Sequence, residues 1–384
     1  MAKLGEICAF QSGGTPSKNK PEYFGGEIPW ISTTALNGGK INEADAVAWI
    51  TPKAIRESAA KIVPANSIMV GTRVGIGKVA INTVEMSTSQ DVISLIGIDK
   101  DKWYKPYLCK LLLSKKDYFN SQARGATIKG IKIDVVANID VPEIDYATQR
   151  KVAATLNKID TLIVLRKQQL EKLDELIKAR FVEMFGTFPA NPFRWSIGKI
   201  QDVVSDVRYG SSRPAVEGGK YPYLRMNNIT YSGELDLRDT KRIDIPDSEL
   251  DKCTVRRGDV LFNRTNSKEL VGKTCVYNRD ELMVLAGFVI RVRINERIRP
   301  EVLSAFLNMD FSKRMLIGMC KTAIGQANIN AKELQNIDLY IPLIELQDQF
   351  VTLKNKIDQQ KQTVQQSLEK LELMKNALMQ EYFG

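Results

Sequence analysis

The tetrapeptide N-K-I-D occurs twice, at Asn157–Asp160 and at Asn355–Asp358, and each copy opens onto a long charged and apolar run. The copies are 198 residues apart (157 to 355), and the same shift superimposes L-E-K-L and a final F-G in both runs. Such an ordered series predicts a direct duplication, with residues 1–186 repeated as residues 187–384. The period is far longer than a solenoid unit, so each copy is expected to be a domain followed by a helix.

The last forty residues of each copy predict a long helix. They contain neither glycine nor proline before the final F-G, and apolar residues recur in alternating steps of four and three, the coiled-coil period. Arg166, Gln360 and Ser367 interrupt this period. A helix of about 38 residues would be roughly 57 Å long and could not bury its apolar stripe alone. The predicted seam residues are Val152, Leu156, Ile159, Ile163, Leu170, Leu173, Ile177, Leu346, Phe350, Leu353, Ile357, Val364, Leu371, Met374 and Leu378.

The nearest partner for each helix is its own copy, because two identical units can pair about a pseudo-twofold axis with their helices antiparallel. Upstream of each helix, runs such as S-I-M-V-G and G-D-V-L-F-N between glycine turns predict strands. The predicted fold class is α+β, with two tandem-duplicated mixed α/β domains (1–146 and 187–344), each followed by a long helix (147–186 and 345–384). The two helices are expected to pair as an antiparallel coiled coil.

The chain of 384 residues contains no histidine, five scattered cysteines and ten excess positive charges. Without histidine it lacks the commonest general base and transition-metal ligand, which argues against a hydrolase or metal enzyme, although carboxylate or lysine catalysis stays open. The basic balance suits a polyanion such as nucleic acid. The cysteines form no C-x-x-C pair and Met1–Cys8 has no apolar signal core, so we expect a cytoplasmic protein that binds neither membrane nor metal.

Gly71–Lys78 has the outline of a phosphate-binding loop but not its chemistry. That motif needs glycine, four residues and then Gly-Lys-Ser/Thr, so that backbone amides and the lysine cradle phosphate. Thr72 replaces the first glycine and Val79 the metal-binding hydroxyl. In the second copy Val271–Thr274 regains the threonine, but Ser267 replaces the first glycine. The sequence therefore predicts a glycine-rich turn between strands and no nucleotide bound by this chain.

Polar stretches at matching places in the two copies carry different residues. Arg, Asn, Gln, Ser and Thr read base edges or grip phosphates, so one frame with two polar sets suits two different half-sites. Divergence of surface loops after a duplication would explain the same differences. The aligned stretches are Trp30–Asn37 with Tyr223–Thr230, Gly71–Arg73 with Asn263–Thr265, and Ser121–Gly130 with Cys320–Asn328. The candidate DNA-binding residues are Ser32, Thr33, Thr34, Asn37, Arg73, Lys78, Arg124, Lys129, Arg213, Arg225, Asn227, Asn228, Asn263, Arg264, Lys273, Lys321 and Gln326.

Taken together, these elements resemble the specificity (S) subunit of type I restriction–modification systems. The resemblance rests on I-P-W-I-S-T (Ile28–Thr33), on G-I-G-K-V-A-I (Gly75–Ile81), on the ordered motifs N-I-D-V-P-E-I, Q-R-K-V-A and L-N-K-I-D within Asn138–Asp160, and on their second-copy equivalents. It covers essentially the whole chain, and as an ordered, duplicated set the motifs are specific. Compared with the family, we expect the sequence to start directly in the first recognition domain, with no leading helix.

The resemblance implies a non-catalytic subunit of a bacterial or archaeal restriction system. Its two target-recognition domains would each read one half of a bipartite, asymmetric target in double-stranded DNA, held apart by the coiled coil. The helices and their seam would also dock two methyltransferase subunits, which bind S-adenosylmethionine and methylate adenine at N6. Two restriction subunits that use ATP and Mg²⁺ would be optional further members. This chain itself would bind no cofactor, and no base contact is carried over because recognition residues vary within the family.

Two other functions are compatible with the sequence. A coiled-coil scaffold whose globular ends bind proteins would show little salt dependence of any DNA binding, whereas phosphate contacts give a steep one. A self-contained methyltransferase or NTPase would bind its methyl donor or nucleotide as an isolated chain. The broken loop at Gly71–Lys78 argues against this enzyme, as does Asn191–Arg194 (N-P-F-R), which lacks the second proline of an adenine-methyltransferase element.

Overall fold

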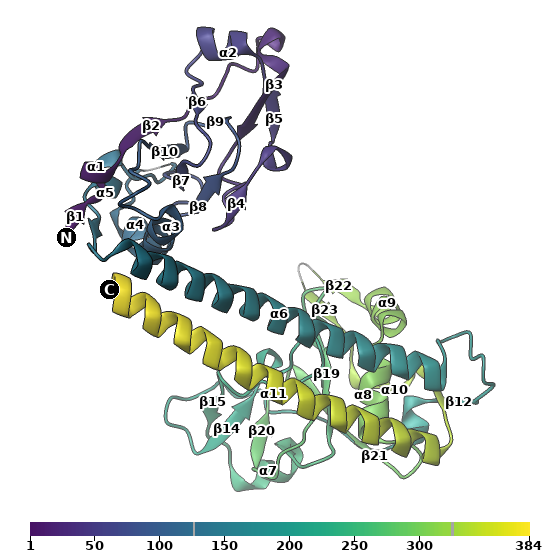
Figure 1. Cartoon of the computed structure of the whole chain (residues 1–384). Coiled ribbons are helices and arrows are strands. Elements are labelled where there is room, and N and C mark those ends of the chain that lie inside the picture. The colour runs from purple at the N-terminus through teal and green to yellow at the C-terminus, as the bar shows by residue number, and fades with distance from the viewer. Residues whose placement is uncertain (126, 324–325) are drawn as a thin grey trace. The chain divides into compact units, whose positions relative to one another are not determined.

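The computed structural model describes residues 1–125, 127–323 and 326–384 and shows a mixed α/β chain with two long helices (Figure 1). By its internal contacts the chain divides into two compact units. Unit 1 comprises Met1–Arg166 and Ser367–Gly384, and unit 2 comprises Lys167–Gln366. The long helices α6 (Tyr146–Phe185) and α11 (Ile344–Phe383) each contribute one segment to each unit.

Unit 1 is built on two larger sheets and one strand pair. Its strands are β1 (Ala2–Lys3), β2 (Ala9–Ser12), β3 (Phe24–Ile31), β4 (Lys40–Ile41), β5 (Ala48–Ile50), β6 (Ile62–Val63), β7 (Ile68–Gly71), β8 (Val79–Asn82), β9 (Met86–Thr88), β10 (Val92–Ile96) and β11 (Asp140–Val141). Its shorter helices are α1 (Leu4–Ile7), α2 (Pro52–Glu57), α3 (Lys105–Ser114), α4 (Lys116–Gln122) and α5 (Ile133–Ala137), with 3-10 turns at Pro21–Tyr23 and Glu43–Asp45. The sheet orders are β5-β3-β9-β6 and β2-β10-β7-β8-β4, with β1 paired to β11. The pairs β3–β9 and β4–β8 are parallel, and the others are antiparallel.

Unit 2 has the same kind of architecture. Its strands are β12 (Ser196–Lys199), β13 (Val204–Tyr209), β14 (Tyr221–Leu224), β15 (Lys241–Ile243), β16 (Thr254–Val255), β17 (Val260–Asn263), β18 (Thr265–Asn266), β19 (Thr274–Val276), β20 (Met283–Leu285), β21 (Val289–Ile294), β22 (Lys321–Ala323), β23 (Gln326–Asn328) and β24 (Asp338–Ile341). Its shorter helices are α7 (Asp247–Cys253), α8 (Pro300–Asn308), α9 (Asp310–Met319) and α10 (Ala331–Gln335), with 3-10 turns at Ile200–Val203 and Met226–Asn228. The orders β15-β14-β20-β16 and β13-β21-β17-β19 follow those of unit 1, and β14–β20 is again parallel.

The strands β7 and β17 lie at corresponding places and are buried along their whole length, as expected for central strands. Gly71 N donates to Lys78 O at 2.8 Å, and Asn263 N donates to Lys273 O at 2.9 Å, so the next strand returns in the same way in both units. The expected glycine-rich turn between strands is confirmed. It passes through Gly77 at a φ of +74°, a left-handed conformation that favours glycine.

One buried glutamine ties the start of α6 to the loop before α3. Gln149 is 1% exposed. Its Oε1 accepts a hydrogen bond from Tyr104 N at 2.8 Å, and its Nε2 donates to Lys102 O at 3.1 Å and to Ile144 O at 2.9 Å. The side chain thus satisfies three backbone groups near a helix terminus, where unpaired groups are otherwise frequent.

The equivalent glutamine of the second copy makes the equivalent bonds. Gln347 Oε1 accepts from Arg299 N at 2.8 Å, while Nε2 donates to Arg297 O at 3.1 Å and to Pro342 O at 2.8 Å. Gln347 stands 198 residues after Gln149, the shift that aligns N-K-I-D. The match in sequence is therefore also a match in hydrogen bonding.

The helices α6 and α11 are each 40 residues long. Asp145 caps α6, because its Oδ1 accepts from Thr148 N at 2.9 Å. The helix ends before Gly186, whose φ of +82° is the left-handed conformation typical of a helix C-terminus. In the described parts of the chain, no helix is both long and apolar enough to cross a bilayer.

In unit 1 the stripe of α6 packs into the domain core. Val152, Leu156 and Ile159 are buried, and Val152 and Leu156 belong to the same apolar cluster as the buried face of α3. The end of α11 joins this cluster through Phe383, whose ring centroid lies 5.1 Å from that of Tyr107. Both long helices therefore contribute apolar surface to the core of unit 1.

In unit 2 three aromatic rings join α6 to α11. Phe181, Phe185 and Phe350 are fully buried, with centroids 5.0 to 5.6 Å apart in edge-to-face geometry. Ile357 and Val364 are also buried. The remaining seam residues, in both units, are partly buried: Ile163, Leu170, Leu173, Ile177, Leu346, Leu353, Leu371 and Leu378.

Met374 was expected in the seam, and the structure corrects this. Its side chain is 54% exposed. The inward positions after Leu371 are Lys375, whose Nζ lies 2.7 Å from Asp160 Oδ1, and then Leu378. From Leu371 the inward positions therefore step by four to Lys375 and then by three to Leu378. Lys375, which pairs with Asp160 of α6, faces inward where the apolar pattern predicted Met374.

Candidate DNA interface

The loop after β3 carries the first group of candidates. Ser32 Oγ lies 2.8 Å from Thr34 Oγ1, and Asn37 Oδ1 accepts a hydrogen bond from Gly39 N at 2.9 Å. Thr34 and Asn37 are exposed, whereas Thr33 is buried. We therefore expect Ser32, Thr34 and Asn37, but not Thr33, to reach a ligand.

Four cations gather around the β7–β8 turn and the hairpin that pairs Arg124 with Gly130. Arg73, Lys78, Arg124 and Lys129 are all exposed. The hairpin lies against the turn, since a Cβ on Gly130 would come within 3.0 Å of Arg73 Cγ. Exposed lysine and arginine on adjoining loops are suited to neutralise DNA phosphates.

In unit 2 the segment after β14 is held mainly by internal bonds. Asn228 is buried, accepts from Arg225 N at 2.8 Å and donates to Asp236 O at 2.8 Å. Arg225 forms an ion pair with Asp239, with 3.0 Å between Nη2 and Oδ2. Asn227 is exposed. The side chain of this segment that remains turned to solvent is therefore that of Asn227, while Asn228 shapes the loop.

Arg213 is exposed but already engaged. Its Nη2 and Nε lie 2.7 and 3.2 Å from the two carboxylate oxygens of Glu249. The hydrogen bond from Arg213 holds the pKa of Glu249 below its usual value. A DNA contact by Arg213 would have to compete with this two-pronged pair.

Asn263 and Lys273 lie inside unit 2. Asn263 is fully buried, and its Nδ2 donates to Leu270 O at 3.4 Å. Lys273 Nζ donates to Met226 O at 2.9 Å, and burial lowers the pKa of its ammonium group. Both side chains hydrogen-bond to the backbone of neighbouring segments. We therefore expect them to shape the loops and not to contact DNA directly.

Arg264 is partly exposed, and its guanidinium lies over the ring of Tyr209 at 4.9 Å from the centroid. The candidates Lys321 and Gln326 lie in β22 and β23, which pair with each other, and β23 pairs with β18. The side chains of Lys321 and Gln326 lie outside what the structure describes. β18 begins at Thr265, directly after Arg264, and pairs there with Asn328 of β23.

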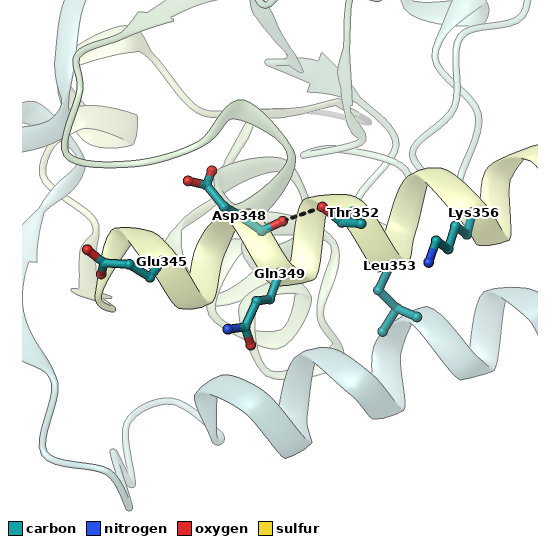
Figure 2. A pocket seen from close by; sticks show the side chains of 6 residues that line it. All are labelled: Glu345, Asp348, Gln349, Thr352, Leu353 and Lys356. Carbon is teal, nitrogen blue, oxygen red and sulfur yellow. Dashed lines mark hydrogen bonds between the residues drawn. The ribbon is translucent and has the colours of Figure 1, made fainter.

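A shallow hollow lies on the first turns of α11, where Figure 2 shows Gln349 and Leu353 pointing toward the neighbouring segment of α6. Asp348 at its edge is paired with Arg299. The hollow is lined by Glu345, Asp348, Gln349, Thr352, Leu353 and Lys356. Among the residues that the structure describes, no three Cys, Asp or Glu side chains come together as a metal site requires.

The sequence reasoning missed the polar links within the helix pair. Lys361 of α11 is buried and its Nζ contacts Asp174 of α6 and Glu234 of the domain. Burial works against its charge, but the hydrogen bonds to the two carboxylates outweigh it and raise the pKa of Lys361. The sequence did contain a signal for these links. Lys361 and Lys375 each follow an apolar seam residue, Ile357 or Leu371, by four positions and so lie on the same face of the helix.

Comparison with known proteins shows what this chain is similar to. Residues 1–175 match the type I restriction modification DNA specificity domain. The specificity subunit of the type I restriction enzyme MjaIX from Methanocaldococcus jannaschii is 28% identical over 274 residues, which are 63% of this chain and 62% of the relative. The specificity subunit of EcoKI from Escherichia coli is 21% identical over 345 residues, 84% of this chain and 74% of the relative. The chain thus spans less than two thirds of the length of the first of these relatives.

Two solved structures share the fold. The S subunit of a type I restriction–modification system from M. genitalium aligns with a TM-score of 0.59 at 14% identity, covering 100% of this chain and 95% of that one. A chain from a structure of complex assembly and conformational transition in a type I system aligns with a TM-score of 0.61 at 20% identity, covering 100% and 96%. These similarities to type I restriction–modification specificity subunits confirm the resemblance seen in the sequence.

Proposed function

We propose that this chain is the non-catalytic DNA-recognition subunit of a type I restriction–modification complex. Its two domains would read the two halves of a bipartite, asymmetric target in double-stranded DNA. One observation carries the proposal: a shared backbone frame presents different polar side chains in the two units. Arg73 and Arg124 are exposed on this frame in unit 1, whereas Asn227 and the stacked Arg264 occupy it in unit 2. Different side chains on one frame are what two unequal half-sites require.

Each part of the chain would have its own role in this function. Residues 1–146 and 187–344 would be the tandem recognition domains, and α6 and α11 would pair as an antiparallel coiled coil that sets the spacer. Supporting this, Arg166 Nε donates to Ser367 Oγ at 3.2 Å within unit 1, where α6 begins and α11 ends. Phe181 and Phe350 pack edge to face within unit 2, where α6 ends and α11 begins.

Partner subunits would supply the chemistry. We propose that two methyltransferase subunits, carrying S-adenosylmethionine, dock on the helix pair, with two restriction subunits that use ATP and Mg²⁺ as further members. Exposed apolar side chains on α6 and α11 support a docking role: Val164, Leu165, Leu373 and Met374 are 52 to 70% exposed. This chain would bind no cofactor, since Gly71–Lys78 forms a plain strand-to-strand turn. We propose that the chain is located in the cytoplasm.

The test is base-resolution mapping of methylated adenine in the host, with and without this gene. One bipartite motif should lose its methylation on deletion and regain it on complementation. If no motif changes in a strain shown to express this chain and a methyltransferase partner, the DNA-recognition proposal fails. A protein-binding scaffold would then be the better description, and DNA binding with little salt dependence would agree with it.

A further inference from the structure

Arg264 sits where three segments of unit 2 meet: the end of β13, the end of β17 and the turn before β21. Its backbone is fixed on both sides, because Arg264 N donates to Phe288 O at 3.0 Å and Arg264 O accepts from Ile329 N at 2.9 Å. Its guanidinium carbon lies 4.9 Å from the ring centroid of Tyr209. Stacking on an aromatic face orients the planar guanidinium without using its N–H groups.

Two nitrogens of the Arg264 guanidinium, Nε and Nη1, are poorly satisfied by the residues that the structure describes. Nη1 reaches Gly287 O at 3.5 Å, the limit of a hydrogen bond. Nε is buried and has no hydrogen-bond partner among the described residues. A guanidinium has five N–H donors, and donors without partners are costly when buried. The guanidinium of Arg264 is thus held in one orientation and has N–H donors to spare, which suits a ligand with two hydrogen-bond acceptors.

The surroundings of Arg264 suit a base better than a phosphate. Tyr209 is 42% exposed and Phe288 is 54% exposed. Exposed rings offer faces for base stacking and for the thymine methyl group, whereas phosphates are usually bound by polar donors. Two exposed rings beside one arginine therefore favour contact with base edges.

The same place in unit 1 is built with different side chains. Thr72 N donates to Asp91 O and Ile131 N donates to Thr72 O, both at 2.8 Å, which repeats the backbone bonds of Arg264. Thr72 is buried and its hydroxyl donates back to Asp91 O. The frame does not need an arginine here, so Arg264 is not explained by folding.

Strand register extends the comparison to the aromatic neighbours. Gly13 N donates to Val92 O in unit 1, and Gly210 N donates to Val289 O in unit 2. The residues before these glycines are therefore equivalent, so Tyr209 of unit 2 corresponds to Ser12 of unit 1. The set Ser12, Thr72 and Asp91 in unit 1 corresponds to Tyr209, Arg264 and Phe288 in unit 2.

We propose that Arg264, oriented by Tyr209, reads a guanine in the half of the target bound by the second domain, with Phe288 against the neighbouring base. The inference rests on the proposed function. The guanidinium fork matches guanine O6 and N7 in the major groove, the commonest specific contact of arginine. Tyr209 acts as a positioning residue and Arg264 as the specificity-determining one.

The first test maps adenine methylation in the host carrying Arg264→Gln or Arg264→Lys. The half read by the second domain is the one that persists when residues 1–146 are exchanged. In that half, one G·C position should become degenerate while every other position is kept. Arg257→Lys is the control, because Arg257 is exposed on the same unit but paired with Asp280, and the motif should be unchanged.

The second test measures competition binding by the purified complex, with oligonucleotides that differ only at that position. The wild-type preference for guanine should be about 5- to 100-fold and should fall to about 1- to 2-fold in Arg264→Gln. This ratio does not depend on how much of the variant is folded. Tyr209→Leu should lower the ratio. Tyr209→Phe loses the hydroxyl that accepts a hydrogen bond from Ala331 N at 2.8 Å but keeps the ring face under the guanidinium, so it should keep the ratio.

Three results would overturn the inference. They are a second half without any G·C pair, an unchanged preference in Arg264→Gln, and a uniform loss of affinity across all four bases, which is the signature of a phosphate contact. None of these would touch the proposed function. That proposal fails only if deletion of the gene leaves every methylated motif intact.

Discussion

Lys110 Nζ lies 2.7 Å from Asp160 Oδ2, and this pair ties α3 of the first domain to α6. The other oxygen of Asp160 lies 2.7 Å from Lys375 Nζ of α11, so one carboxylate joins the domain to both long helices within unit 1. Asp160 is the aspartate of the first N-K-I-D. In the second N-K-I-D, Asp358 pairs instead with Lys354 one turn earlier on its own helix, at 2.6 Å. The repeated motif therefore keeps its place in the helix but has different partners in the two copies.

Replacing Asp160 with Asn should destabilise unit 1 more than the same change at Asp358 destabilises unit 2. Breaking a buried ion pair costs about 3–5 kcal/mol, and because Asp160 is partly exposed we expect about 2 kcal/mol. The helical pair at Asp358 should be worth only about 0.3–0.5 kcal/mol. Urea unfolding followed by hydrogen exchange in each unit measures both. Equal effects would mean that the three-way contact of Asp160 adds nothing.

The effect of Asp160→Asn should also depend on pH. Burial opposes the charge of Asp160, but hydrogen bonds from Lys110 and Lys375 outweigh it and lower its pKa. The stabilisation is therefore complete above the unfolded pKa of about 3.9 and is lost as pH falls through the lower folded pKa. The difference between wild type and variant should shrink below about pH 4. A difference that stays constant to lower pH would contradict an electrostatic origin.

Replacing Gln149 or Gln347 with Ala should destabilise the chain by about 2–4 kcal/mol in each case, because three backbone groups, most of them partly buried, lose their partner. The two variants should be similar, since the bonds are equivalent. Thermal unfolding checks this. Gln168→Ala, at an exposed position of α6, is the control and should stay within about 0.5 kcal/mol of wild type.

Lys313 should make stability rise with pH above neutrality. Burial, and secondarily Lys178 and Lys273, lowers the pKa of Lys313 to about 7. Its Nζ donates to Gly272 O at 2.6 Å. Between about pH 7 and its unfolded value near 10.4, the unfolded state binds more protons, so stability rises by up to ~1.4 kcal/mol per pH unit. Urea unfolding of wild type and Lys313→Met across this range tests it, and parallel profiles would contradict the assignment.

Exchanging residues 1–146 for another recognition domain should change one half of the methylated motif and leave the other. The reason is that, under the proposed function, each of the two domains reads one half-site with its own polar side chains. Methylation mapping in the host gives both halves in one experiment. If both halves changed, or neither did, the modular reading would be wrong.

Inserting seven residues after Arg166 and seven before Ser367 should lengthen the spacer of the target. Seven residues keep the helical stripe in phase and add about 10 Å, which corresponds to about three base pairs of DNA. The insertion points preserve both units. Motif mapping measures the spacer, and an active complex with an unchanged spacer would refute the role of the helices as a ruler.

The long helices were predictable because their signal is local. A run of forty residues without glycine or proline and with a coiled-coil period has few alternatives to a helix, and α6 and α11 each span 40 residues. The strands β7 and β17 were visible as the short apolar runs S-I-M-V-G and G-D-V-L-F-N. The exposed position of Met374 could not be predicted, because it depends on the ion pair between its neighbour Lys375 and Asp160 on the other long helix.

The candidate interface was less predictable from the sequence. Polar residue types suggested Asn228, Asn263 and Lys273, but their side chains are buried on backbone partners. Tyr209 and Phe288 were not suspected. They lie 55 and 24 residues from Arg264 in the chain, and only the pairing of β13 and β17 with β21 brings the three together.

The sequence alone thus determined the repeated motifs and the two helices and indicated the resemblance to a family, because repeats and periodicity can be read directly along the chain. The tertiary structure decided which polar side chains face solvent and which charges meet. Those outcomes depend on strand register and helix packing, which join residues far apart in the chain. Asp160 and Asp358 show the difference, since identical tetrapeptides in identical helical positions acquire different partners from the surfaces around them.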